Sequence, residues 1–410
     1  MILFRKIVLK LSKLFLSIIS AIIIFPVSFI IPKKKSLIIF IGESGNFMDN
    51  VKYLYLHCHE NNKHAFEYYF LTNKVQCYNE LKSSGLPVLL YPTIISVFML
   101  LRAKIVVVDG INWVYKCKYY LAFFSFKVQL WHGVGFKTIE KEMYKKYNKF
   151  KRFLLKIYFA LTARFPLYDL FISTSPFYSE NVFSKGFRLK RIVDFGYPRN
   201  DIMHKKDFLN FYLLGADNSN INKVEDAVKD GFKILLYVPT FRDKGLNPIE
   251  DGALNLKKLN SFCEENKIKF VIKFHLLTRV NNNVNKELFN NIIFYDSSKD
   301  IYPLYSNVDL MLTDYSSIYM DFLHLNRPIF FFNYDFEIYN SRDRKLQFDY
   351  DEMTPGPKCF SQEDLQCEIY NFIQKGQDKY KEIRSELFKK AFLYYDGDSS
   401  KRIFEELLKI

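Results

Sequence analysis

The sequence predicts an α/β protein with two Rossmann-like domains that face a cleft. Short, mostly apolar runs alternate with longer segments of helical period through residues 36–410, as in parallel sheets that are buried on both faces. A polar stretch near the middle of the chain separates these elements into two sets of similar size. The length of 410 residues also favours two domains, because a single core rarely grows beyond about 250–300 residues.

The composition is that of a globular protein, with 49% apolar and 25% charged residues. The six cysteines are scattered without CxxC spacing. They predict reduced thiols in a cytosolic compartment, and they argue against both a disulfide framework and a zinc site.

The net charge of +15 is unevenly distributed, because residues 1–35 hold seven basic residues and no acidic one. These basic residues flank apolar sequence, which fits an anionic membrane surface better than nucleic acid. The sequence contains no recognisable nucleic-acid-binding motif, so we expect no nucleic acid partner.

Residues 1–35 are predicted to form a membrane-associating segment. Residues 4–18 have a helical period, with apolar side chains on one side and four basic residues on the other. Residues 14–31 are uncharged and would extend about 27 Å as a helix, slightly less than a hydrocarbon core of about 30 Å. We expect a peripheral, uncleaved anchor on the cytoplasmic face of the cell membrane, with a single-pass anchor as the alternative.

Residues 36–215 are predicted to form the first Rossmann-like domain. Its strands are expected at residues 37–41, 66–71, 105–108, 127–130 and 169–174. The fourth strand runs into Trp131-His132-Gly133, at the edge of the sheet where open α/β folds bind their ligands. His132 is therefore a candidate catalytic residue, and the alternative is a histidine that only packs at a strand end.

Residues 137–164, within this domain, interleave basic and aromatic side chains. The pattern fits either a solvated helix face or a second membrane-facing helix, and both interpretations stay open.

Residues 216–230 are polar and are expected to link the domains, and residues 231–410 are predicted to form the second Rossmann-like domain. Its strands are expected at residues 233–238, 269–274, 309–312 and 328–332. Polar side chains at the carboxyl ends of three strands predict a ligand site at this edge of the sheet. They are Thr240 and Arg242 after the first strand, His275 after the second, and Thr313, Asp314, Ser316 and Ser317 after the third.

Ser316 and Ser317 are expected to open a helix directly after the strand 309–312. Their hydroxyl groups and the unpaired backbone N–H groups would then meet at a positive helix terminus, which suits a phosphate. The alternative is that Ser316 only caps this helix.

Seven motifs extend these observations across the chain. They are WHGVGFK (131–137), GYPRND (196–201), VPTFRD (238–243), KFH (273–275), LTDYSS (312–317), RPIFFFNYDFEIY (327–339) and FDYDEMTPGP (348–357). In this order they closely resemble the CDP-glycerol glycerophosphotransferase family, which includes teichoic acid primases and polymerases and related capsule enzymes. The resemblance implies a two-domain GT-B fold, association with the cytoplasmic membrane face, and transfer of a polyol phosphate from a CDP-polyol to an acceptor hydroxyl.

The resemblance also implies roles for single residues. It places the essential histidines of the family at His132 and His275, and donor-phosphate contacts at Thr313, Ser316 and Ser317. Leu276 follows His275 where the family usually has proline, a departure that would loosen this turn.

The implied reaction moves glycerol phosphate, or a related polyol phosphate, from CDP-glycerol to a hydroxyl of a lipid-linked acceptor and releases CMP. A neutral histidine is a suitable base at pH 7, so we assign His132 as the base and His275 as a phosphate ligand or acid. Arg242 and Arg199 are the candidate cations for the diphosphate. Further donor contacts are expected at Thr240, Asp314 and Gly133. The scheme requires no metal or other cofactor, although dependence on a divalent metal stays open.

Two other functions remain open. A GT-B glycosyltransferase that uses a nucleotide sugar would share the fold and the phosphate-binding helix. A non-catalytic, membrane-bound scaffold would keep the fold alone, but the presence of both histidines, the TDYSS stretch and Arg242 argues against it.

Overall fold

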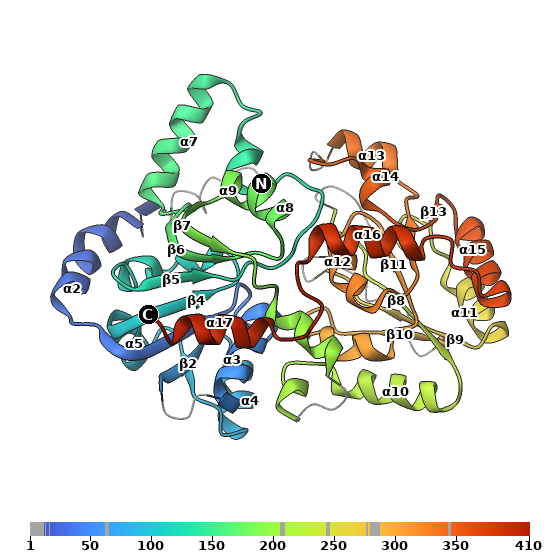
Figure 1. Ribbon diagram of the computed structural model, residues 1–410, viewed down its shortest axis with the longest axis horizontal. Helices are drawn as coiled ribbons and strands as arrows, with labels where there is room; N and C mark the ends of the chain where they lie inside the picture. Colours follow the sequence, from blue (N-terminus) through green and yellow to red (C-terminus); the bar gives the residue numbers. More distant parts are fainter. Residues whose placement is uncertain are drawn as a thin grey trace. The chain divides into compact units, whose positions relative to one another are not determined.

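The computed structural model describes residues 12, 14, 15, 17–61, 65–205, 210–242, 247–275, 278, 288–342 and 346–410, without the side chains of 340–342. These residues form two compact units (Figure 1). The first unit combines the chain up to His132 with Ile139–Gly215 and Asp396–Ile410. The second unit combines Gly133–Thr138 with Ala216–Tyr395.

The first unit is built on a parallel seven-stranded sheet with the order β3-β2-β1-β4-β5-β6-β7. Its strands are β1 (Lys34–Ile41), β2 (Glu67–Thr72), β3 (Val88–Leu90), β4 (Ala103–Val108), β5 (Phe126–Gln129), β6 (Leu167–Ile172) and β7 (Arg188–Val193). In the centre, Ile39 of β1 lies opposite Tyr69 of β2 and Val106 of β4. The strand order reverses between β1 and β4, so ligand binding is expected at their carboxyl ends.

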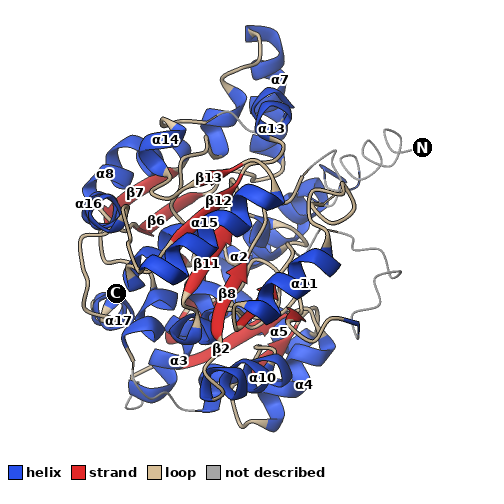
Figure 2. Cartoon of the chain, turned by 90° about the vertical axis from the view of Figure 1, so that its right-hand side faces the viewer, coloured by secondary structure: helices blue, strands red, loops and turns tan. Residues whose placement is uncertain are grey.

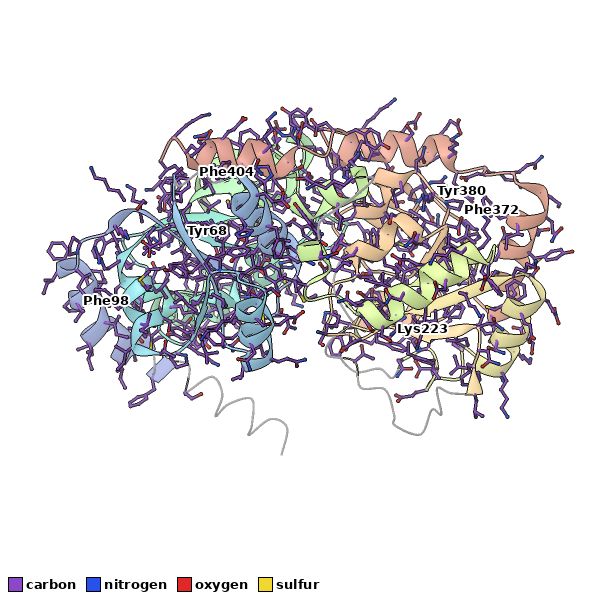
Figure 3. The ribbon with its side chains drawn as sticks, turned by 90° about the horizontal axis from the view of Figure 1, so that it is seen from below. Tyr68, Phe98, Lys223, Phe372, Tyr380 and Phe404 are labelled. Atoms are coloured by element: carbon purple, nitrogen blue, oxygen red, sulfur yellow. The ribbon has the colours of Figure 1, made fainter. Side chains whose placement is uncertain are left out.

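Helices precede, connect and follow these strands. They are α2 (Phe25–Ile30), α3 (Asp49–Asn61), α4 (Val75–Ser83), α5 (Ile94–Arg102), α6 (Lys118–Leu121), α7 (Lys149–Leu161), α8 (Pro176–Tyr178), α9 (Ser184–Gly186) and α17 (Ser399–Leu407). Two of them show why they begin where they do: Thr93 and Ser96 form a capping box at α5, and the Asn148 side chain accepts the N–H of Lys151 at α7. The last helix, α17, packs against α3 and buries Ile403 and Leu407. Phe404, labelled in Figure 3, lies between them in the sequence of this helix.

The N-terminal segment is helical from residue 17 to residue 30, and it includes a π-helix (Ser20–Ile24) followed by α2. Phe25 packs its ring against Phe123, with centroids 4.8 Å apart, while Phe29 and Ile30 are exposed. Within the described residues, no helix combines the length and the apolar character needed to cross a membrane. Most of the expected helix 4–18 lies outside the described residues.

The second unit is built on a parallel six-stranded sheet with the order β10-β9-β8-β11-β12-β13. Its strands are β8 (Lys233–Tyr237), β9 (Ile268–Ile272), β10 (Ile292–Phe294), β11 (Leu310–Thr313), β12 (Ile329–Phe332) and β13 (Lys358–Cys359). Here the order reverses between β8 and β11, which again marks the expected place for a ligand.

The helices of the second unit are α10 (Asn218–Lys229), α11 (Leu256–Glu265), α12 (Tyr319–Phe322), α13 (Phe336–Arg342), α14 (Tyr350–Met353), α15 (Gln362–Lys375) and α16 (Lys381–Ala391). Helices α11 and α15 pack on one face of the sheet (Figure 2), where Leu259 and Leu365 join the buried side chains of β8 and β11.

Two limits of the expected domains differ from the observed units. Residues 216–230, expected as a linker, contain α10, whose N-terminus is capped by the Asp217 side chain and whose Ile221 and Val224 are buried. The stretch looks polar because only one narrow face of this helix enters the core. Residues 396–410, expected in the second domain, belong to the first unit.

Candidate active site

His132 lies three residues beyond β5, on a turn held by hydrogen bonds from other segments. Trp131 adopts the left-handed conformation with φ +59°, which is unusual for a bulky side chain. Its N–H donates to Oε1 of Gln129 over 2.9 Å, and Nε2 of Gln129 donates to the carbonyl of Gly110 over 2.8 Å. The last residue of β5 therefore sets the direction in which the chain leaves the sheet.

The imidazole of His132 has a defined tautomer. Its Nδ1 lies 3.0 Å from the backbone carbonyl oxygen of Asp109, and because a carbonyl only accepts hydrogen bonds, Nδ1 carries the proton. Nε2 is then the proton-accepting nitrogen of the neutral ring. The residue is exposed, and its ring lies 4.0 Å from that of Trp131. This arrangement suits a general base.

Asp109 joins the loops at the carboxyl ends of β1 and β4. Its side chain is buried and accepts the N–H of Glu43 over 2.8 Å and the N–H of Val51, in the first turn of α3, over 3.3 Å. Burial, followed by the neighbouring carboxylate of Asp49, raises the pKa of Asp109 well above its usual value. The residue whose carbonyl orients His132 is thus itself fixed at the point where the strand order reverses.

Arg199, from the GYPRND motif, supports the same turn. The side chain is 4% exposed, and Nη1 lies 2.5 Å from Oδ1 of Asp49 and donates to the carbonyl of His132 over 3.0 Å. The structure therefore brings Arg199 and His132 together, with the guanidinium engaged by protein groups. A contact of Arg199 with a diphosphate stays a prediction.

In the second unit, Arg242 is held by two carboxylates that follow β11 and β12. Nε and Nη2 donate to both oxygens of Asp335 over 2.6 and 3.0 Å, and Nη2 lies 2.9 Å from Oδ2 of Asp314. Nη1 donates to the carbonyl of Thr240 over 2.8 Å. Burial opposes the charged form, but Asp314 and Asp335 outweigh it and raise the pKa of Arg242 above its usual value. Every nitrogen of this guanidinium already has a protein partner.

The turn after β11 differs from the expected one. The helix begins at Tyr319 and is four residues long, so the expectation that Ser316 and Ser317 open it is wrong. Oδ1 of Asp314 accepts a hydrogen bond from the N–H of Tyr315, and the N–H of Met320 donates to the carbonyl of Ser317. A tight turn therefore precedes the helix. Ser316 Oγ lies 3.5 Å from the N–H of Ile318 and makes at most a weak cap.

The other predicted donor contacts of this unit occupy different environments. Thr313 is fully buried and donates its hydroxyl to the carbonyl of Val238 over 2.9 Å, which ties β11 to the loop after β8. Ser316 and Ser317 are half-buried. Gly135 packs against Ser317 so closely that an added Cβ would lie 2.7 Å from the serine Cβ. The second glycine of WHGVGFK therefore allows residues 133–138 to lie on this turn, and Gly133, with φ +145°, opens the segment.

Buried polar atoms without partners mark the carboxyl ends of β8 and β12. Among the described residues, the Tyr237 hydroxyl, Thr240 Oγ1 and Asn333 Oδ1 are buried and form no hydrogen bond. Such atoms are uncommon in proteins, and a ligand or water usually completes them. Thr240, a predicted donor contact, belongs to this set.

His275 lies three residues beyond β9 and is exposed. Its ring is 5.6 Å from that of Phe241, in the loop after β8, and its carbonyl accepts the N–H of Thr278. Leu276, which was expected to loosen this turn, lies outside the described residues. The structure thus places His275 beside the loop that carries Thr240 and Arg242.

Comparison with known proteins decides the family. The sequence profile of the CDP-glycerol:poly(glycerophosphate) glycerophosphotransferases matches residues 23–409. This chain belongs to that family. The family is one of transferases.

Related proteins show how far the similarity reaches. The teichoic acid poly(glycerol phosphate) polymerase of Bacillus spizizenii is 31% identical over 296 residues, which cover 68% of this chain and 69% of the relative. The polymerase of the same kind from Bacillus subtilis is 27% identical over 396 residues, 92% of this chain but only 49% of the relative. A solved structure of the wall teichoic acid polymerase TagF has a TM-score of 0.73 at 22% identity and covers 99% of this chain and 97% of that one. The transferase therefore shares the TagF fold.

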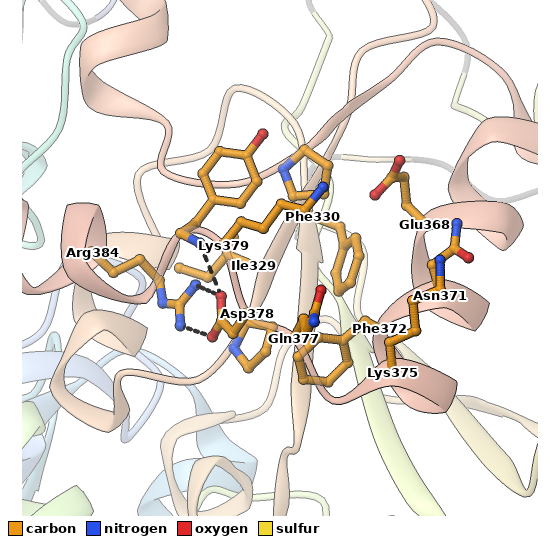
Figure 4. Close-up of a pocket in the computed structure, with 13 residues that line it drawn as sticks. Ile329, Phe330, Glu368, Asn371, Phe372, Lys375, Gln377, Asp378, Lys379 and Arg384 are labelled. Atoms are coloured by element: carbon orange, nitrogen blue, oxygen red, sulfur yellow. Dashed lines mark hydrogen bonds and ion pairs between the residues drawn. The ribbon is translucent and has the colours of Figure 1, made fainter.

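A cavity of about 160 Å³ in the second unit lies away from these residues (Figure 4). Pro328 and Pro357, just before β12 and β13, line it, so it opens at the amino ends of these strands. Arg384 is 1% exposed, pairs with Asp378 and donates to the carbonyl of Asn326, which stabilises the turn between α15 and α16. Since ligands of parallel sheets bind at the carboxyl ends, this cavity is not the candidate active site of the transferase.

Sequence reasoning missed Asn50, Gln129 and Asp335, which hold the turn of His132 and the guanidinium of Arg242. Asp335 lies three residues beyond a predicted strand, in FFFNYD, and this position could have signalled a site residue. Asn50 carries no comparable signal, because its partners are about 80 and 150 residues away in the sequence.

Proposed function

We propose that this chain transfers glycerol phosphate from CDP-glycerol to a hydroxyl of a lipid-linked acceptor, releasing CMP, in the synthesis of a teichoic-acid-like or capsular polymer. One observation carries the proposal: in a member of this family, an exposed histidine at a sheet edge commits Nδ1 to a carbonyl and keeps Nε2 as a proton acceptor. The solved TagF structures include one soaked with CDPG, which supports CDP-glycerol as the donor class.

In the proposed reaction, Nε2 of His132 accepts the proton of the acceptor hydroxyl. At the same time, the oxygen of this hydroxyl attacks the phosphorus that carries glycerol. The bond from this phosphorus to the bridging oxygen of the diphosphate breaks, and CMP leaves with the electron pair of that bond. Phosphoryl transfer depends chiefly on the position and charge of the groups around the phosphorus. Each step uses groups that the chain itself provides.

We assign donor binding to the second unit. Thr240, Ser316, Ser317 and His275 are the proposed contacts, and the unpaired Thr240 hydroxyl supports this assignment. Arg242, Asp314 and Thr313 already bind one another or the backbone, so we propose that they shape the loops around the donor. Asp314 and Asp335 place two negative charges around the single positive charge of Arg242. The negative phosphates are therefore expected to bind hydroxyl and N–H groups instead of this guanidinium.

We further propose that the first unit rests on the cytoplasmic face of the membrane. Helix α7 has no buried residue, and five apolar side chains on one side of it are 43–72% exposed: Phe150, Phe153, Leu154, Ile157 and Leu161. Lys149, Lys151, Arg152 and Lys156 lie on the other side. Ile94 and Ile95 of α5 are exposed as well, and Phe98 is 47% exposed (Figure 3). An apolar face beside basic residues suits the surface of an anionic membrane.

The choice of donor tests this function. The purified full chain is incubated with vesicles that carry a lipid-linked acceptor and with labelled CDP-glycerol, CDP-ribitol or UDP-sugars. We expect release of CMP from CDP-glycerol and a matching mass increase of the acceptor. Transfer of a sugar from a UDP-sugar would establish a glycosyltransferase, and binding of CDP-glycerol without any CMP release would establish a scaffold.

A further inference from the structure

We infer that Asn50 is a positioning residue that holds the turn of His132 in its left-handed conformation. The catalytic part of this inference rests on the proposed function. The conformational part rests on the contacts alone.

The turn must be stabilised by contacts from other segments, because the φ of Trp131 lies in a region that residues with a Cβ avoid. Nothing in the local sequence favours this conformation, since neither glycine nor asparagine occupies position 131. The surrounding structure must therefore impose it. Gln129 holds the N–H of Trp131 over 2.9 Å, but this contact leaves the two following carbonyl groups unconstrained.

Asn50 supplies the missing constraint from α3. Its side chain is fully buried, its Nδ2 donates to the carbonyl of Trp131 over 2.8 Å, and its Oδ1 accepts the N–H of Arg199 over 3.2 Å. A carbonyl only accepts and a backbone N–H only donates, so the orientation of the amide is determined. The Trp131 carbonyl is thereby tied to the GYPRND segment.

Arg199 completes the arrangement, because its Nη1 donates to the next carbonyl, that of His132. Two successive carbonyls of the turn are therefore held by α3 and by GYPRND, and these two segments are joined by the Asn50–Arg199 hydrogen bond. The imidazole follows the backbone, and in this conformation of the turn its Nδ1 lies 3.0 Å from the Asp109 carbonyl oxygen.

Only an amide of this length meets both requirements. Aspartate keeps the acceptor for Arg199, but it faces the Trp131 carbonyl with an oxygen in place of a donor. Alanine loses both contacts. In either variant we expect the turn to relax toward negative φ and the base to move by a fraction of an ångström or more, which costs up to about a hundredfold in rate.

The experiment compares Asn50→Ala and Asn50→Asp with Asn61→Ala, a control on the same helix whose exposed amide donates to the carbonyl of His57. Turnover of CDP-glycerol, its KM and the melting temperature are measured for each variant. We expect kcat to fall about 10- to 100-fold in both Asn50 variants, with KM nearly unchanged and the control like wild type.

A second readout does not need activity. Trp113 and Trp131 are the two tryptophans of the chain, so a Trp113→Phe background makes Trp131 the single indole, with its ring centroid 4.0 Å from that of His132. We expect its emission to change in both Asn50 variants but not in the control. If wild type turns over no CDP-glycerol, the proposed function is wrong, but the fluorescence still tests whether Asn50 fixes the conformation of the turn. Unchanged emission and unchanged kcat in Asn50→Asp, which keeps the size of the side chain, would overturn the inference.

Discussion

The positive charge of Arg242 is balanced by two carboxylates of the second unit. Its guanidinium is buried between Asp314 and Asp335 and lies 5.1 Å from the ring centre of Tyr334. Asp335 also accepts the hydroxyl of Tyr315. The arginine thus joins the loops after β8, β11 and β12, and its charge is balanced within the fold.

Asp335→Asn should weaken this junction. Hydrogen bonds to charged groups contribute roughly 1.5–3 kcal/mol each, so we expect a clear fall in melting temperature and a several-fold loss of CDP-glycerol affinity. Thermal melts and calorimetry measure the two effects. The matched control is Asp251→Asn, an exposed carboxylate that accepts the Tyr334 hydroxyl and should change neither value. An Asp335→Asn protein that melts and binds like wild type would show that the junction is unimportant.

The double variant Ser316→Ala/Ser317→Ala separates phosphate binding from capping. The weak contact of Ser316 with the Ile318 N–H predicts little loss of stability. As phosphate ligands, the two hydroxyls should together contribute about a hundredfold or more to CDP-glycerol affinity. Calorimetry with CDP-glycerol and with cytidine, beside thermal melts, makes the comparison. Equal losses for both ligands would count against phosphate contacts at this turn.

Single site residues could be predicted from the sequence where they follow the end of a predicted strand. His132, His275, Thr240 and Arg242 all follow apolar runs, and the carboxyl ends of parallel strands meet at one edge of a sheet. Their partners were not predictable. The ring of His132 depends on a backbone carbonyl, that of Asp109, and Arg242 depends on a carboxylate 93 residues away. Such contacts arise from tertiary packing and leave no local pattern.

Helix α17 shows how one carboxylate holds a whole element. Asp201, of GYPRND, is buried, and its two oxygens accept the N–H groups of Ser399 and Ser400 at the start of the helix over 3.0 and 2.7 Å. Burial raises the pKa of Asp201 to about 7, although these hydrogen bonds oppose the shift.

The raised pKa predicts a dependence of stability on pH. The folded state binds the Asp201 proton more tightly than the unfolded state, whose carboxyl titrates near pH 4. The resulting stability is fully present below about pH 4 and is lost as the pH rises through about 7. Urea denaturation should therefore show a free energy of unfolding that falls from pH 5 to 8 more steeply in wild type than in Asp201→Asn.

His57 titrates in part of the same range with the opposite sign. Burial, helped by Lys205, lowers the pKa of His57 to about 4, so its stability contribution is lost as the pH falls below about 6.5. Because His57 is present in both proteins, its effect cancels in their difference. Parallel pH profiles of wild type and Asp201→Asn would contradict the assignment to Asp201.

Helix α7 predicts the mode of membrane binding. Phe150→Ser/Phe153→Ser removes two exposed aromatic rings from its apolar side and should reduce sedimentation with anionic vesicles several-fold. Phe360→Ser, which removes a 60% exposed ring from the second unit, is the control for the loss of an exposed aromatic side chain elsewhere. High salt should weaken binding further by screening the basic side. Binding of the double variant equal to that of wild type would exclude α7 from the membrane surface.

Helices and strands differed in how clearly the sequence predicted them. All nine expected strands are present, because each is a compact apolar run. Four strands were missed: β3 and β10 have three residues each and β13 has two, while β7 reads Arg-Leu-Lys-Arg-Ile-Val. Short or charged edge strands are held by their neighbours and lack a pattern of their own. The basic segment 137–164 does contain an amphipathic helix, α7.

At the scale of the molecule, the predicted fold class is confirmed by two parallel sheets and by the likeness to TagF. The sequence did not show which core each segment joins. Residues 133–138 and 396–410 each pack with the unit that is more distant along the chain, because hydrophobic periodicity reports the face of an element and not its partner.

The assignment of His132 as the base of a glycerophosphotransferase underlies the proposed mechanism. Its most direct test measures CMP release from CDP-glycerol, with a lipid-linked acceptor, for wild type, His132→Ala and the control His59→Ala, whose ring contacts Tyr68 in the same unit. We predict that His132→Ala lowers turnover by roughly 10²–10⁴-fold while its CDP-glycerol affinity and melting temperature stay near those of wild type. His132→Ala protein that releases CMP at the wild-type rate would contradict this account.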